Sequence, residues 1–169
     1  MNYLTLVLRF VHIMGGIFWV GAAMVMNFFV GPSLRATGEA GKSFAGHLMA
    51  KTRFVMVMNI SVYSSVITGV WLYGKDSQWF TSPWMSSGAG IGFTMGALFG
   101  LVGLITGAMN GGNNQKLAKL GAQIQGKQTP EQAAQLGTIA KQQAWVVPVN
   151  SFTLLTAAFF MAISRYLMF

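Results

Sequence analysis

One apolar stretch near the start of the chain carries chemistry-bearing side chains at helical spacing. Arg9, His12, Gly16 and Trp19 follow one another at intervals of three, four and three residues, which places all four on one face of a helix. Ionisable groups inside an apolar span are costly, so they normally face protein, a cofactor or water. The pattern indicates one of two roles for His12. It ligates a metal or the metal of a macrocycle, with Gly16 leaving room for a flat ring, or it hydrogen-bonds across a helix bundle whose close packing Gly16 allows.

Side chains on later segments are expected at the depth of His12. If each apolar segment is a membrane-spanning helix, Met95, Met161 and Arg165 share that depth. Histidine and methionine together are a known pair of haem ligands, so Met95 or Met161 is a candidate sixth ligand; the alternative is that both are packing residues. Arg9 and Arg165 are candidates to pair with haem propionates or, alternatively, extend to the headgroups.

The second histidine of the chain is not expected to reach the first. His47 precedes the second apolar segment, on the opposite side of the membrane from His12. At 1.5 Å of rise per residue, the two imidazoles are roughly 30 Å apart along the membrane normal. A haem held by both histidines of one chain is therefore not predicted.

The composition indicates an integral membrane protein. Charged residues make up 8% of the 169 and apolar residues 53%, whereas roughly a quarter of a typical soluble domain is charged. The absence of cysteine excludes disulfide frameworks, thiolate nucleophiles, cysteine zinc sites, iron–sulfur clusters and covalently attached haem. The net charge of +8 lacks the aromatic and basic interleaving of nucleic-acid binders, so no nucleic-acid partner is predicted and the bilayer is the expected partner.

The chain is expected to fold as a single all-α membrane domain over residues 1–169, a four-helix bundle. Four apolar segments are long enough to cross a hydrocarbon core of about 30 Å, and backbone groups in lipid must be satisfied within each segment, which favours helices. The Gly31-Pro32 pair is expected to end the first span. The predicted spans are residues 4–30, 54–73, 89–109 and 145–168.

Basic residues predict the orientation of the spans. They gather in the loops that follow spans one and three, and the positive-inside rule makes those loops cytoplasmic, so both termini face outward in a multi-pass cytoplasmic (inner) membrane protein. Helical spacing of apolar residues, with a capping box at Thr129 and Gln132, predicts that residues 110–144 form a cytoplasmic helical hairpin between spans three and four. This hairpin is a solvated connector or a docking surface for another subunit.

Small and polar residues within the spans indicate helix packing. The third span carries glycines at intervals of three or four, which favour a close helix neighbour or a cofactor lying on the flat face; they are Gly88, Gly92, Gly96, Gly100, Gly103, Gly107 and Gly111. Asn59 and Tyr63 share a face of the second span, where interhelical hydrogen bonding is expected, or the lining of a quinone or proton path. The spans contain no carboxylate, which argues against an acidic proton relay.

The motif that begins at His12 resembles one in a known group of proteins. His12, Gly16, Trp19 and Gly21 form the pattern H-x3-G-x2-W-x-G, followed by Gly-Pro-Ser-Leu-Arg at 31–35. This order is similar to that of small four-helix membrane proteins around the copper-resistance protein D domain and the bacterial membrane protoporphyrinogen oxidase. The resemblance covers roughly residues 5–73. It implies a four-helix bundle with a first-span histidine, here His12, near a haem or metal site.

These observations favour a membrane protein that binds a b-type haem or a similar macrocycle through His12, in electron transfer or haem-linked redox chemistry. Two alternatives remain: a non-catalytic subunit of a larger respiratory or photosynthetic complex, or a protein that carries copper or a small solute. Other membrane subunits or further copies of the chain are the expected partners. No residue set indicates an enzyme.

Overall fold

The structure of the protein is a computed structural model that describes residues 3–124 and 126–168. This part of the chain is helical and contains no strand. Four of its continuous helical segments are long and apolar enough to cross a membrane, so the prediction of an all-helical, multi-pass membrane protein is confirmed. The elements are α1 (Tyr3–Val25), η1 (Met26–Val30), α2 (Gly31–Ala36), α3 (Glu39–Lys51), α4 (Phe54–Asp76), η2 (Pro83–Ser86), α5 (Gly88–Gln123), α6 (Pro130–Ile163) and η3 (Ser164–Tyr166).

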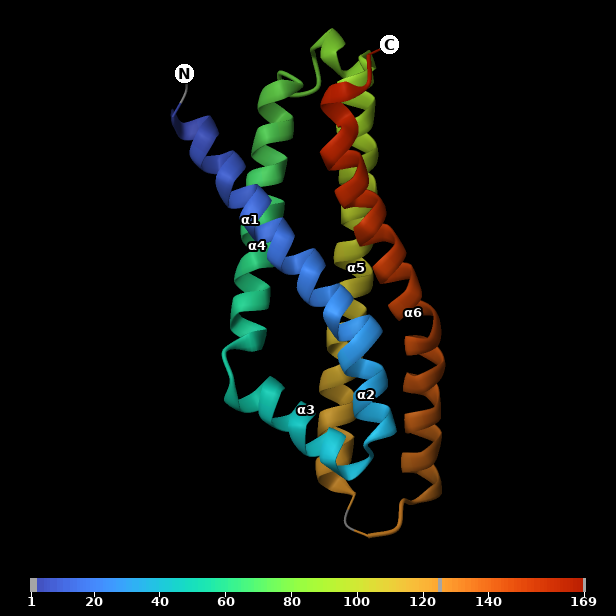
Figure 1. Ribbon diagram of the computed structural model, residues 1–169. Helices are drawn as coiled ribbons and strands as arrows, with labels where there is room; N and C mark the ends of the chain where they lie inside the picture. The colour runs from blue at the N-terminus through green and yellow to red at the C-terminus, as the bar shows by residue number, and fades with distance from the viewer. Residues whose placement is uncertain (1–2, 125, 169) are drawn as a thin grey trace.

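The long helices form two antiparallel pairs, α1 with α4 and α5 with α6. Figure 1 shows α1 crossing α4 obliquely and approaching α6 at its other end, while the two ends of the chain lie at the same end of the molecule. The pairs meet through a small apolar core made of Trp19 and Ala23 from α1 and Leu154 from α6. Most other large apolar side chains face outward, as expected for a protein surrounded by lipid.

The glycine row of α5 packs against α6. A methyl group added at Gly103 would lie 2.5 Å from Leu154 Cδ2, and one added at Gly92 would lie 2.6 Å from Ser164 Oγ. At Gly111 an added methyl group would meet nothing within 4 Å. The predicted close neighbour of this row is therefore confirmed and is α6. The alternative, a flat cofactor on the part of the glycine face that α6 leaves uncovered, stays a prediction.

The helical path of the first apolar segment does not end at Gly31-Pro32. The helical path continues through the wider turn of η1 into α2 and reaches Ala36. Proline normally breaks a helix because its ring meets the carbonyl four residues earlier and its nitrogen has no hydrogen. Pro32 lies in the first turn of α2, directly after this π-helical turn. Because the turn already departs from the α-helical hydrogen-bond pattern, the proline can follow it without ending the segment.

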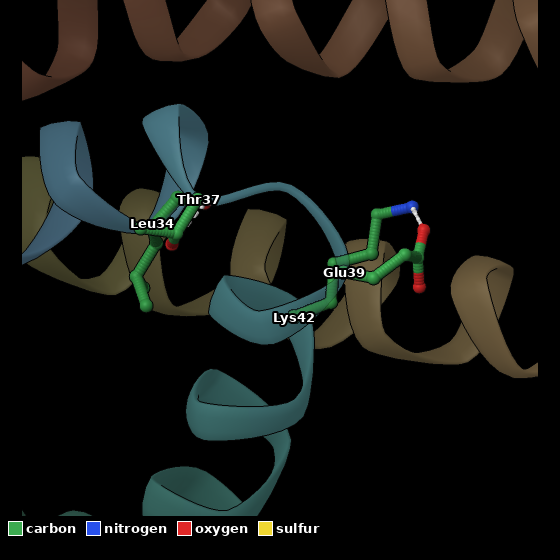
Figure 2. A network of polar contacts seen from close by, with 4 residues as sticks. All are labelled: Leu34, Thr37, Glu39 and Lys42. Atoms are coloured by element: carbon green, nitrogen blue, oxygen red, sulfur yellow. Dashed lines mark hydrogen bonds and ion pairs between the residues drawn. The ribbon is translucent and has the colours of Figure 1, made fainter.

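A glycine turn connects α2 to α3. Gly38 has a φ of 56°, in the left-handed region that a residue with a Cβ rarely adopts. Figure 2 shows the contacts on either side of this turn, from the Thr37 hydroxyl to the Leu34 carbonyl and from Lys42 Nζ to Glu39 Oε1 at 2.6 Å.

The connection between α5 and α6 carries the predicted cap. Thr129 accepts from the backbone amide of Gln132, whose side chain accepts in return from the amide of Thr129. This reciprocal pair confirms the capping box at the start of α6. Leu120 of α5 and Ile139 of α6 are buried in the segments on either side of the connection.

Candidate functional site

His12 lies between α1 and α4 and is half-buried. Its Nδ1 is 2.8 Å from the backbone carbonyl oxygen of Ser65, and the Ser65 hydroxyl donates to the His12 carbonyl at 3.1 Å. Because a carbonyl oxygen can only accept, Nδ1 must carry the proton of the neutral imidazole. Nε2 then holds the lone pair, and within the described residues it forms no hydrogen bond. A carbonyl partner of this kind orients most metal-ligating histidines.

Gly69 gives the imidazole its place against α4. A methyl group added at Gly69 would lie 2.8 Å from His12 Cε1 and 3.0 Å from Nδ1, so only glycine lets the ring lie this close to the helix. Ser65 and Gly69 were not singled out by the sequence analysis as partners of His12. Ser61, Ser65 and Gly69 do follow one another at intervals of four, a small-residue pattern that indicates a close helix neighbour.

Arg9 forms an ion pair with the last residue of α4. Its Nη2 is 3.6 Å from Asp76 Oδ2, and the two side chains are 39% and 34% exposed. One residue earlier, Lys75 Nζ donates to the Thr5 hydroxyl. Arg9 therefore has a partner within the chain, and its expected role beside a haem propionate stays a prediction. Asp76 lies beyond the predicted second span, residues 54–73, whereas the helix α4 extends to include it.

Gly16 and Trp19 continue the predicted face toward the middle of α1. A methyl group at Gly16 would meet only Ser65 Oγ, at the ordinary contact distance of 3.5 Å, whereas one at Gly15 would lie 2.8 Å from the Ser61 carbonyl oxygen. The close approach of α1 to α4 is therefore at Gly15. Trp19 is 8% exposed and belongs to the apolar core that joins the two helix pairs.

The other predicted site residues lie on the second helix pair. Met161 packs on Gly96, with its sulfur 3.3 Å from the place of an added methyl group, and Met95 is half-buried on α5. Neither has a contact with His12 in the described part of the chain that would identify it as a second ligand. Arg165 is exposed in η3 and forms no ion pair with the described residues. Ligation by either methionine stays a prediction.

His47 is exposed on α3, the helix that precedes α4 in the chain. Figure 1 shows α3 at the end of the molecule opposite the chain ends. Among residues 3–124 and 126–168, no three His, Asp or Glu residues gather into a group that could hold a metal ion. A hollow lined by Phe29, Leu34 and Phe44, among others, lies between α2 and α3 and away from His12.

Polar residues in the spans fall into two groups. Asn27 of η1 donates to Ser151 Oγ at 2.9 Å, and Asn150 Nδ2 donates to the carbonyl of Gly103 at 2.9 Å. These bonds confirm the expectation that such residues pair between helices. Asn59 and Tyr63 are exposed, and their side chains form no hydrogen bond with the described residues. The interhelical bonding expected for them is therefore absent from this part of a single chain.

Chemically, the structure offers one oriented imidazole nitrogen beside a polar helix interface. Comparison of the chain with protein-family models, with curated proteins and with solved structures finds no match.

Proposed function

We propose that this chain is a multi-pass protein of the cytoplasmic membrane that binds a b-type haem, or a similar macrocycle, through Nε2 of His12. The observation that carries the proposal is the 2.8 Å contact between His12 Nδ1 and the Ser65 carbonyl oxygen. It places the proton of the neutral imidazole on Nδ1, which leaves the lone pair of Nε2 available to a metal, and it is the kind of partner that raises the basicity of a metal-bound histidine.

The residues around His12 supply one oriented ligand for such a group, and they do not identify a second ligand. The imidazole is oriented by Ser65 and Gly69, so His12 Nε2 would be the atom that holds the group. Among the described residues Met95 and Met161 form no contact with His12, and Arg9 is engaged by Asp76. A bound haem would supply one-electron redox chemistry, while the protein would hold and orient it. The resemblance of residues 5–73 to the copper-resistance protein D and protoporphyrinogen oxidase group is part of this proposal, as is the outward orientation of both termini.

The test is a reduced-minus-oxidised visible spectrum of the detergent-purified protein, together with a pyridine haemochrome assay. We expect the bands of a b-type haem at about one haem per chain or per dimer. His12→Asn is the sharpest variant because the Asn amide can still donate to the Ser65 carbonyl from the place of Nδ1, while the Nε2 ligand is removed. It should fold normally and lose the pigment. His47→Asn is the matched control and should keep it.

An unchanged spectrum in His12→Asn would contradict ligation by His12. If neither the wild-type protein nor the variants contain a pigment, and His12→Ala is less stable than His12→Asn, the histidine serves to pair α1 with α4. That outcome would favour the second candidate function, a non-catalytic subunit of a larger membrane complex. The observation that favours this candidate is the exposure of Asn59 and Tyr63 on α4, because polar side chains in lipid normally contact protein.

A further inference from the structure

Helix α3 joins two segments that are each apolar and long enough to cross a membrane. The first of these segments runs from Tyr3 to Ala36, and the second begins at Phe54. Figure 1 shows α3 running across the end of the molecule opposite the chain ends, from the end of α2 to the start of α4. A helix that connects the ends of two membrane spans lies where hydrocarbon meets water. We therefore expect the surface of α3 to contact the headgroup layer.

One flank of α3 faces the hydrocarbon side of this boundary. Phe44 lines the hollow between α2 and α3 together with Phe29 and Val30, which belong to the first apolar segment. Phe44 is 56% exposed and Phe29 is 68% exposed, so the described chain leaves most of each side chain uncovered. Gly46 lies two residues, and thus about 200°, further around the helix, and a methyl group added there would meet nothing within 4 Å. Phe44 and Gly46 therefore mark opposite flanks of α3.

The charges at the two ends of α3 are positive and unpaired. Within α3, Lys42 forms an ion pair with Glu39 at 2.6 Å. Arg35, Lys51 and Arg53 are exposed, and they form no ion pair with the residues that the structure describes. Arg35 lies in the last turn of α2, whereas Lys51 and Arg53 lie where α3 ends and α4 begins. Basic side chains placed in this way next to a bilayer attract anionic headgroups.

We propose that α3 is a surface helix that binds the headgroup layer of an anionic membrane, with Phe44 inserted among the acyl chains. Interfacial helices combine basic residues, which contact the headgroups, with aromatic residues that enter the acyl boundary, and α3 with its flanking residues has both. The unpaired positive charges favour anionic phospholipids as the occupant, and the shared hollow places Phe44 beside Phe29 of the apolar segment. The proposal goes beyond the binding of a haem and does not depend on it, because this hollow lies away from His12.

The absence of cysteine from the chain makes the test direct. Single cysteines are introduced into the full chain, each variant is placed as one copy per lipid nanodisc, and labelling by a water-soluble maleimide is timed. A thiol reacts as the thiolate, which is disfavoured in apolar surroundings. We expect Phe44→Cys to label about tenfold more slowly than Gly46→Cys in discs that contain phosphatidylglycerol. Phe159→Cys, at a position 57% exposed on α6, is the reference for a side chain that faces lipid.

A further variant keeps the aromatic anchor in place. Ala40 is exposed and lines the same hollow as Phe44, so Ala40→Cys leaves the phenylalanine unchanged. It should also label more slowly than Gly46→Cys. Rapid labelling of both Ala40→Cys and Phe44→Cys, at the rate of Gly46→Cys, would overturn the proposal because this flank of α3 would then face water. Since each disc holds one copy, slow labelling cannot come from a second copy or from another subunit.

The lipid composition tests the role of charge. In discs of phosphatidylcholine alone, Ala40→Cys and Phe44→Cys should label about threefold to tenfold faster than in discs with phosphatidylglycerol, and high salt should give a similar increase in the latter. Phe159→Cys should label equally slowly in both lipids, because its protection does not depend on headgroup charge. Equal protection of Ala40→Cys and Phe44→Cys in the two lipids would overturn the assignment of anionic headgroups as the partner of α3.

Discussion

Helices α5 and α6 approach each other most closely at glycine residues of α5, whereas α1 and α4 are joined by contacts of charged and titratable side chains. In α5, Gly103 and Gly92 approach Leu154 and Ser164 so closely that a methyl group at either position would overlap its neighbour. Between α1 and α4 the described residues form three contacts with a charged or titratable side chain, from His12 to Ser65, from Arg9 to Asp76 and from Lys75 to Thr5. Small residues also lie between α1 and α4, and hydrogen bonds from Asn150 and Gln143 also join α5 and α6. Among the described residues, the contacts of charged and titratable side chains within a helix pair are those between α1 and α4.

This difference separates two tasks. Close packing through glycine maximises dispersion between helices and depends on shape, so it leaves no group free to bind anything. A hydrogen bond from an imidazole N–H to a backbone carbonyl costs some packing but holds the other ring nitrogen in a chosen direction. The α5/α6 pair is therefore suited to stabilising the fold, and the α1/α4 pair is suited to holding a side chain that binds a ligand. Substitutions in each pair can test the division.

The largest loss of stability is expected at the glycine contact. Gly103→Val places side-chain atoms where Leu154 lies, and that leucine is 1% exposed and has no space to move into. We expect a loss of about 2–3 kcal/mol in the free energy of unfolding, measured by thermal or SDS unfolding of the detergent-solubilised protein. Gly111→Val is the matched control because an added side chain there meets open space, and it should change stability by less than about 0.5 kcal/mol. Similar losses at the two positions would contradict the comparison.

A smaller loss is expected at a polar contact inside the glycine pair. Asn150→Ala removes the donor to the Gly103 carbonyl and the acceptor at 3.4 Å from the Asn27 amide. We expect a loss of about 1–2 kcal/mol in the same unfolding measurement. Thr156→Ala removes a hydroxyl that bonds only within its own helix and is the control. If Asn150→Ala costs more than Gly103→Val, polar contacts dominate both pairs.

The smallest effect is expected at the ion pair between α1 and α4. The side chains of Arg9 and Asp76 are 39% and 34% exposed, so water and ions screen their attraction. A double-mutant cycle with Arg9→Gln and Asp76→Asn should give a coupling energy below about 1 kcal/mol, and the coupling should fall further in high salt. A coupling well above that value, unaffected by salt, would mean that the pair is shielded from water and contributes more to the α1/α4 contact than its exposure indicates.

Local patterns predicted most of the fold. The four apolar spans, the glycine row and the Thr129 cap each depend on residues close in sequence, and each is present. The continuation of the helix past Pro32 was not predictable, because the effect of a proline depends on the hydrogen-bond pattern of the preceding turn. The partner of His12 was not predictable because it depends on how α1 and α4 are rotated against each other. Spacing shows which face of a helix is polar, but it does not show which helix meets that face.

Each helix pair consists of spans that are consecutive in the chain, and this order has a consequence for synthesis. α1 can find α4 as soon as α4 has left the ribosome, before α5 exists, and α6 then completes the second hairpin on its own. Few contacts besides the Trp19 core, Asn27 and the Tyr73–Thr94 hydrogen bond join the two hairpins. A chain divided within the η2 connection is therefore expected to give two hairpins that each form in the membrane through their own contacts.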